Sequence, residues 1–239
     1  MKENSQPPAA SRRKFLQTAL AIIPSTALAT SVVPAALAAE QTKNPTRDYV
    51  PVFFKDDEWR FIIAATDVLI PGDEYGPGAV SEGVPVFIDR QMEMPYGYGQ
   101  LWYMKPPFQE GSPLLGYQKN LTPRDIYRRG IAALNKACQT TYQHPFASLA
   151  TADKVQVMED LESGKLVTED VDGKLFFAQL LENTKEGYLA DPIHGGNQTM
   201  ASWKMIGFPG ARADYVQVMD NPGKPYLPGP VSISGKYGA

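Results

Sequence analysis

Residues that commonly hold metals and haem are scarce in this sequence. It contains two histidines, His144 and His194, and one cysteine, Cys138, among 239 residues. There is no Cys-x-x-Cys-His segment and no group of residues at zinc-ligand spacing. The stretch Asp170–Gly173 begins like a calcium loop but lacks the later ligands, so we interpret it as an acidic turn before a helix. We therefore expect no metal or other cofactor in this chain.

The lone cysteine excludes a disulfide within the chain. Cys138 lies at helical spacing from Tyr127, Ile131 and Leu134, which predicts one buried face of a helix. We favour a thiol packed in the core. An exposed thiol or a disulfide to another chain stays an alternative.

Motifs for nucleotide binding and for nucleophilic catalysis are also missing. The segments Gly76–Gly78 and Gly97–Gly99 do not follow an apolar strand, as a dinucleotide site requires. No Gly-x-Ser-x-Gly segment marks a nucleophile. His194 lies in a Gly-rich loop, and we favour a turn or a docking contact for it. An enzyme that acts alone, with a site built from this loop around His194, is the alternative.

Long hydrophobic runs are missing after residue 39, where no eighteen consecutive residues are apolar. We therefore expect membrane contact only through partners. Removal of residues 1–39 would leave 19 basic and 25 acidic residues, without a basic stripe. This acidic balance gives no electrostatic basis for binding nucleic acid.

The most specific stretch lies near the N-terminus, where two arginines precede a weakly hydrophobic run that prolines interrupt. Its defining residues are Ser11, Arg12, Arg13, Phe15 and Leu16. This layout is typical of a twin-arginine export signal, which the translocase reads as an address. The route carries folded proteins, usually with a cofactor already bound, and predicts a periplasmic location. Small residues at 36–38 suit cleavage, so we expect a signal peptide over residues 1–39, with an uncleaved anchor as the alternative.

The remaining sequence predicts a mainly α-helical fold in a single domain. Residues 40–52 are interpreted as an extended lead-in, and residues 53–239 as the helical domain with an extended C-terminal arm. Thr122 and Thr151 are expected to cap helices. The apolar spacing predicts helices over residues 55–70, from residue 84, over 122–142, over 151–164 and over 174–183. Few or no strands are expected.

Two stretches combine aromatic residues with Pro and Gly and show no regular period. One runs from Met92 to Leu121, and the other begins at Gly187. Such stretches are often binding surface, although aromatic loops that pack on the core give the same pattern. A periplasmic module that stacks a sugar on these rings is a further alternative. Our candidate partner contacts are Tyr98, Trp102, Tyr103, Phe108, His194, Asn197, Trp203 and Phe208.

Several segments are familiar in their order and spacing. They are the twin-arginine leader, the Trp59–Pro71 helix, Gly83–Arg90, Gly187–Pro192, Gly195–Asn197 and Trp203–Gly210. Together, over roughly residues 50–212, they resemble the gluconate 2-dehydrogenase subunit 3 family. No single motif carries the resemblance.

The resemblance implies a small, or gamma, subunit of a membrane-associated periplasmic dehydrogenase complex. In such complexes the large subunit carries FAD and oxidises a sugar or sugar acid, and a multihaem cytochrome c subunit passes electrons to quinone. The small subunit supplies the export signal for the assembled pair and stabilises the flavoprotein. The family offers no catalytic residues to transfer, so we expect a subunit that is not itself catalytic.

Overall fold

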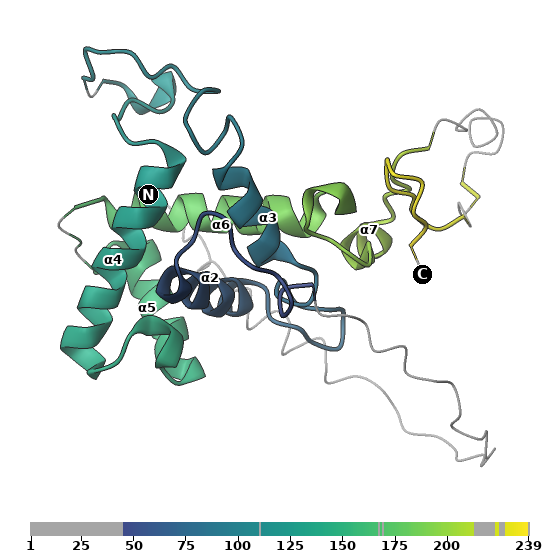
Figure 1. Cartoon of the computed structure of the whole chain (residues 1–239), viewed down its shortest axis with the longest axis horizontal. Helices are drawn as coiled ribbons and strands as arrows, with labels where there is room; N and C mark the ends of the chain where they lie inside the picture. The colour runs from purple at the N-terminus through teal and green to yellow at the C-terminus, as the bar shows by residue number, and fades with distance from the viewer. Residues whose placement is uncertain are drawn as a thin grey trace, which may run out of the picture. The chain divides into compact units, whose positions relative to one another are not determined.

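A computed structural model describes residues 45–109, 111–166, 168, 170–212, 223–224 and 228–238. The predicted signal peptide, the first part of the lead-in and part of the predicted C-terminal arm lie outside the described residues. The described part contains six α-helices and no β-strand, so the predicted mainly α fold is confirmed (Figure 1). None of these helices combines the length and apolarity that crossing a bilayer requires.

The first three helices follow the sequence closely. Helix α2 spans Asp56–Leu69, α3 spans Val84–Met92 and α4 spans Pro123–Tyr142. Thr122 caps α4 as expected, because its hydroxyl accepts a bond from the Asp125 N–H while the Asp125 carboxylate accepts from the Thr122 N–H. The acidic first turn of α2 suits the positive end of its helix dipole.

The later helices differ from the prediction in three places. Helix α5 spans Thr151–Ser163, and its N-cap is Ala150, so Thr151 begins the helix without capping it. Helix α6 spans Gly173–Leu189 and continues well past the predicted end at residue 183. A short helix α7, Ala201–Ile206, lies in the segment that we expected to be irregular. Asp172 caps α6, as the acidic-turn interpretation predicted.

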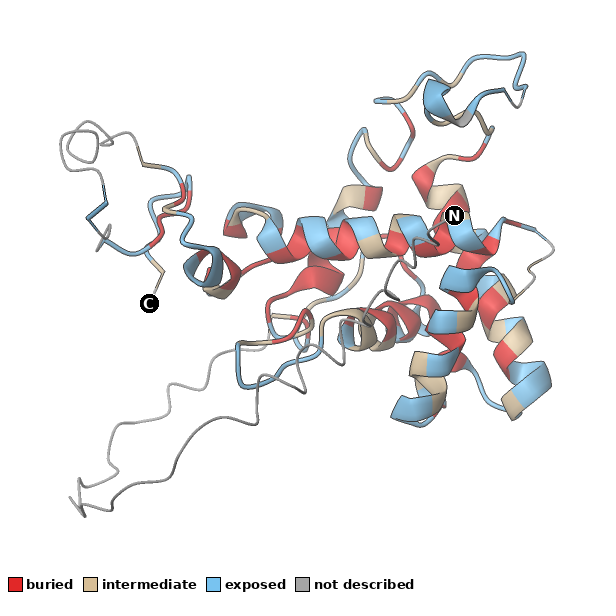
Figure 2. Cartoon of the chain, turned by 180° about the vertical axis from the view of Figure 1, so that it is seen from behind, coloured by how far each residue is buried: buried red, intermediate tan, exposed pale blue. Residues whose placement is uncertain are grey.

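The core is built around α6, which packs against α2, α3, α4, α5 and α7. Phe176 on its buried face packs against Phe61 of α2, and Phe61 packs in turn against Phe146 of the 3-10 turn η2, Phe146–Ser148. Figure 2 shows the buried residues along the helices in red. Gly130 brings α4 close to α6, because a Cβ atom there would lie 2.3 Å from the ring of Phe176. Burial of these aromatic side chains is the main stabilising term of the domain.

Helix α3 also holds the irregular segment after α6. A Cβ atom on Gly196 would lie 2.0 Å from the carbonyl oxygen of Gly187, so the two backbones touch. Gly187 in turn leaves room for the ring of Phe87 on α3. Just before α3, the buried carboxylate of Glu82 accepts bonds from the N–H and the hydroxyl of Thr199. Two remote parts of the chain are thereby fixed together.

Helix α3 also holds the lead-in, through Asp89, whose side chain is fully buried. Its Oδ1 accepts bonds from the N–H groups of Phe53 and Phe54 at 3.0 and 2.9 Å. Its Oδ2 accepts from the Val52 N–H at 2.7 Å and from the Tyr49 hydroxyl at 2.8 Å. Four donors therefore satisfy one buried carboxylate and anchor the segment that enters the domain.

Candidate partner-docking surfaces

The groups with reactive side chains lie apart from one another. His144 and His194 are exposed, and Cys138 is buried. Burial raises the pKa of the Cys138 thiol to about 11, which keeps it protonated at neutral pH. The predicted packing of Cys138 in the core is confirmed. Within the described ranges, no three His, Cys, Asp or Glu residues are placed to share a metal ion.

His194 ends the 3-10 turn η3, Pro192–His194, beside Asp191 and Ser232. Ser232, His194 and Asp191 are the residue types of a Ser-His-Asp catalytic site, but their hydrogen bonds differ from those of such a site. Ser232 Oγ donates directly to Asp191 at 2.6 Å, and the same carboxylate accepts from the N–H groups of Ile193 and Ile233. Burial acts to raise the pKa of Asp191, but these hydrogen bonds hold it below its ordinary value. Asp191 thus ties a turn to the C-terminal segment rather than orienting an imidazole.

The aromatic loop, residues 93–121, joins α3 to α4 and extends beyond the ends of both helices (Figure 1). In its described residues, 93–109 and 111–121, the loop has no α-helix and one 3-10 turn, η1, at Pro113–Leu115. Tyr103 is 82% exposed and Leu114 is 95% exposed, which is unusual for large apolar side chains. The exposed large apolar residues of the loop are Met94, Tyr98, Leu101, Tyr103, Phe108, Leu114 and Leu115.

Other rings of the same loop pack inward. Trp102 lies 4.5 Å from the ring of Tyr117 and meets the edge of Tyr96 at 6.1 Å. The Tyr117 hydroxyl donates to the Leu121 carbonyl at 2.6 Å, which closes the loop near its end. The interpretation of a loop packed on the core therefore holds for these rings, and partner binding by the exposed residues stays a prediction. The inward rings give the loop a fixed shape, and the outward ones form its surface.

A polar network connects the base of the loop to the core. Asn183 on α6 is fully buried, and its Oδ1 accepts from the hydroxyl groups of Tyr127 and Tyr96 at 3.0 and 3.2 Å. Gln179 donates to the same Asn183 oxygen at 2.9 Å. Burial raises the pKa of Tyr127 and of Tyr96, so both remain neutral donors. The loop is thus fixed to α4 and α6 at its start.

A second apolar surface, which we call the C-terminal surface, surrounds α7. Its exposed members are Leu189, Ile193, Met205, Ile206, Phe208, Ile233 and Tyr237. Trp203 supports it from beneath by donating from Nε1 to the Leu189 carbonyl at 2.7 Å and by packing against the ring of Phe208. Asn197 donates to the Ala190 carbonyl and accepts from Ser202. The surface therefore rests on a rigid, hydrogen-bonded support.

The eight candidate contacts divide between these two surfaces. Tyr98, Trp102, Tyr103 and Phe108 belong to the aromatic loop, with Trp102 only partly exposed. His194 and Phe208 are exposed at the C-terminal surface, whereas Asn197 and Trp203 are buried beneath it. Direct contact by these last two would require the surface to open. Sequence reasoning did not name Leu114 and Leu115, and it included Leu101, Met205 and Ile206 only as members of the stretches 92–108 and 203–210.

A cavity of about 310 Å³ lies beside the aromatic loop. Its lining combines two apolar side chains, Phe108 and Leu121, with the polar residues Gln118, Lys119, Asn120, Arg129 and Asp170. The Gln118 amide is already engaged, because it accepts from the Gly111 N–H and donates to the Ser112 carbonyl. The cavity therefore offers fewer groups to a sugar than its composition suggests.

Comparison with known proteins adds one finding. The family model for gluconate 2-dehydrogenase subunit 3 matches residues 56–210, which covers well over half of the chain. The comparison with curated proteins gave no match. The comparison with solved structures gave none either. The matched range begins at α2 and ends after α7, so it includes the core and both surfaces. The chain belongs to the gluconate 2-dehydrogenase subunit 3 family.

Proposed function

We propose that this protein is the small, non-catalytic subunit of an FAD-dependent sugar or sugar-acid dehydrogenase complex of the periplasm. The flavoprotein folds around FAD in the cytoplasm and binds this chain, and the single twin-arginine signal exports both. A multihaem cytochrome c subunit then receives the electrons. FAD and haem c belong to the partner subunits, and this chain contributes the signal and a stabilising contact.

The observation that carries the proposal is the pair of apolar surfaces on a chain of the subunit 3 family. A Phe, Tyr or Trp side chain buries roughly 150–250 Å² of surface when it is fully covered. Weighted by exposure, the seven outward side chains of the aromatic loop present on the order of 800 Å², the share of one partner in a standard interface. The flavoprotein is therefore expected to present an apolar, weakly charged face to this loop.

The export half of the proposal is tested at the signal. Arg12 and Arg13 are both replaced by Lys, and the flavoprotein is followed by immunoblotting of cytoplasmic and periplasmic fractions. We expect both subunits to stay in the cytoplasm, because the translocase reads the arginine pair. Export of the flavoprotein together with the doubly substituted chain would refute shared transport.

The docking half is tested at the surface. Leu114→Asp and Tyr103→Asp place a charge on the most exposed part of the aromatic loop, and we expect at least a ten-fold loss of affinity for the flavoprotein. The matched variant Met205→Asp does the same on the C-terminal surface and identifies which surface binds. Unchanged co-purification of the flavoprotein with all three variants would contradict the proposal.

The catalytic role is tested on this chain alone. The purified protein is assayed with sugars and an artificial electron acceptor, and its absorbance is recorded between 350 and 500 nm, the region where flavins absorb. We expect neither turnover nor flavin absorbance. Turnover that His194→Ala abolishes would instead support an enzyme acting alone.

A further inference from the structure

The aromatic loop and the lead-in meet at one arginine, Arg124, on the first turn of α4. Its guanidinium carbon lies 4.3 Å from the ring centre of Tyr98 in the loop and 4.5 Å from that of Phe53, next to the lead-in. Both distances suit a cation–π contact. Arg128, one turn further along α4, lies over the same Phe53 ring at 4.1 Å. We call Tyr98, Arg124, Phe53 and Arg128 the arginine–aromatic stack.

Each end of the stack is fixed by hydrogen bonds. At the loop end, Arg124 Nη1 donates to the Met92 carbonyl and to the Glu93 carboxylate, both at 2.8 Å. The Tyr98 hydroxyl donates to the same carboxylate at 3.1 Å. Tyr98 and Glu93, near the start of the loop, therefore hold the Arg124 guanidinium in its position.

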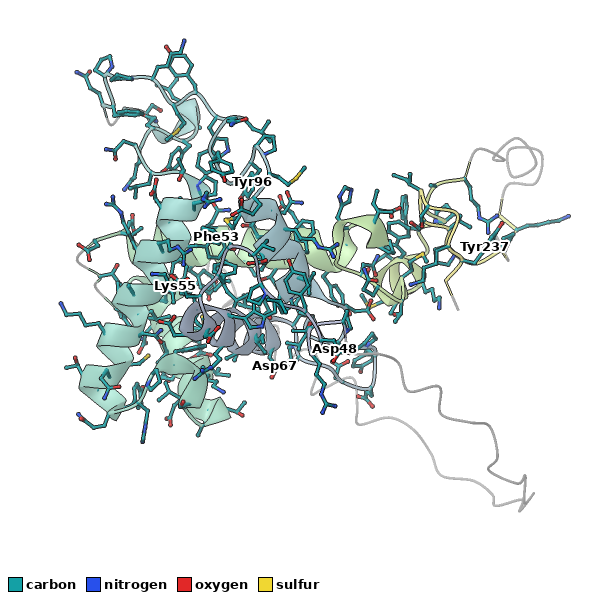
Figure 3. All side chains as sticks on the ribbon, in the orientation of Figure 1. Asp48, Phe53, Lys55, Asp67, Tyr96 and Tyr237 are labelled. Carbon is teal, nitrogen blue, oxygen red and sulfur yellow. The ribbon has the colours of Figure 1, made fainter. Side chains whose placement is uncertain are left out.

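At the other end, Phe53 belongs to the segment that Asp89 holds. Its N–H donates to Asp89 at 3.0 Å, and its carbonyl accepts from Arg128 Nη2 at 2.6 Å. The Arg128 guanidinium also pairs with the largely buried Glu58 carboxylate of α2. Phe53 thus connects the lead-in to α2, α3 and α4. Figure 3 shows Phe53 close to the base of the loop, which Tyr96 marks.

We infer that Arg124 is a positioning residue that couples the aromatic loop to the anchor of the lead-in. The inference deepens the proposed function and rests on it for the identity of the partner. Tyr98 is 47% exposed, so a partner on the loop can contact it, while Arg124 is largely covered. A partner that fixes Tyr98 fixes Arg124 and, through Phe53, strengthens the anchor just downstream of the predicted signal. By linkage, a loosened anchor weakens partner binding by the same factor.

The coupling can be measured in the full-length chain without a partner. Hydrogen exchange at the N–H groups of Val52, Phe53 and Phe54 reports opening of the anchor, because all three donate to Asp89. We expect Tyr98→Ala to accelerate their exchange about five-fold, the effect of one partly exposed cation–π contact. Exchange in α6 serves as the reference for global unfolding. Tyr103→Ala, a more exposed tyrosine of the same loop, is the matched control and should leave the anchor unchanged.

A double-mutant cycle separates coupling from a general loss of structure. Arg124→Gln should accelerate exchange at the anchor, and adding Tyr98→Ala to it should have no further effect. Arg124→Lys keeps the charge but loses the planar group, so it should not restore protection. Tyr98→Phe keeps the ring and should exchange like the wild type. Additive effects of Tyr98→Ala and Arg124→Gln, or no effect of Tyr98→Ala at the anchor, would overturn the inference.

The effect of the partner is measured with the flavoprotein that co-purifies with this chain. Binding should slow exchange at Val52, Phe53 and Phe54 in the wild type and not in Tyr98→Ala. If no flavoprotein co-purifies, the proposed function fails while the variant results still decide the coupling. If it binds through the aromatic loop, as weaker binding of Leu114→Asp shows, and exchange at the anchor of the wild type is unaffected, the coupling is refuted and the proposed function stands. If it binds through the C-terminal surface instead, the double-mutant cycle alone decides the coupling.

Discussion

Asp89→Asn is the sharpest test of how the domain holds its lead-in. The substitution keeps the size of the side chain and replaces one acceptor oxygen with an NH2 group. Two of the four donors that now bond to Asp89 would then point at this NH2 group. They are the Phe53 and Phe54 N–H groups if the NH2 replaces Oδ1, or the Val52 N–H and the Tyr49 hydroxyl if it replaces Oδ2. Hydrogen bonds to a charged group contribute about 1.5–3 kcal/mol each. Loss of two should lower the free energy of unfolding by roughly 3–6 kcal/mol.

Urea unfolding followed by circular dichroism measures this loss, and thermal unfolding should show a midpoint lower by about 10 °C for a domain of this size. Tyr49→Phe removes one of the four bonds and should cost about 1.5–3 kcal/mol. Asp67→Asn, at an exposed carboxylate of α2, is the control and should change stability by less than about 0.5 kcal/mol. A loss below 1 kcal/mol for Asp89→Asn would show that the four contacts do not anchor the chain.

Three further predictions follow from single residues. Gly196→Ala should cost about 3 kcal/mol or more in urea unfolding because the new Cβ would meet the Gly187 backbone, whereas Gly207→Ala, in open space with φ 71°, should cost only about 1 kcal/mol. Cys138 should react with a thiol reagent only on unfolding, and a covalent dimer on a non-reducing gel would contradict its burial. Burial and the bond to Asp89 raise the pKa of Tyr49 to about 12, so its contribution to stability is complete below pH 10 and is lost as pH rises through 12. Tyr49→Phe should remove that loss, and equal pH slopes in urea titrations of both proteins would contradict it.

Most helices were predictable because their signals are local. The caps of α4 and α6 and the apolar stripe of α2 depend on residues a few positions apart. The length of α6 was not predictable in this way. Gly187 normally signals a helix end, yet here it lies inside α6, where the ring of Phe87 from α3 occupies the space of its missing Cβ. Only the contact between two remote segments reveals that role.

The candidate surfaces were predictable in location but not in detail. Aromatic content singled out stretches that expose large apolar side chains, since most of the named rings lie on or beneath an exposed apolar surface. Composition could not tell Tyr103, which faces solvent, from Trp102, which packs on Tyr117. It also gave no reason to bury Trp203, whose Nε1 reaches the Leu189 carbonyl from fourteen residues away. Such differences depend on packing partners that the linear pattern does not name.

Four of the segments behind the family resemblance, residues 83–90, 187–192, 195–197 and 203–210, meet at one junction of the fold. Gly83, at the start of α3, lies against the Gly195 carbonyl, and Gly196 lies against Gly187. Asn197 and Trp203 bond the backbone at the end of α6. These residues therefore build a scaffold and leave the aromatic loop and the C-terminal surface to make contacts.

This division between scaffold residues at the junction and exposed residues of the two surfaces predicts different effects for substitutions at the two kinds of position. Changes at the junction should reduce stability and partner binding together, because they loosen the support of the C-terminal surface. Changes at exposed positions such as Leu114 should reduce binding alone, since their side chains contribute little to the core. The proposed role in export requires both properties, a folded scaffold and an exposed apolar surface, and in this chain different residues provide them.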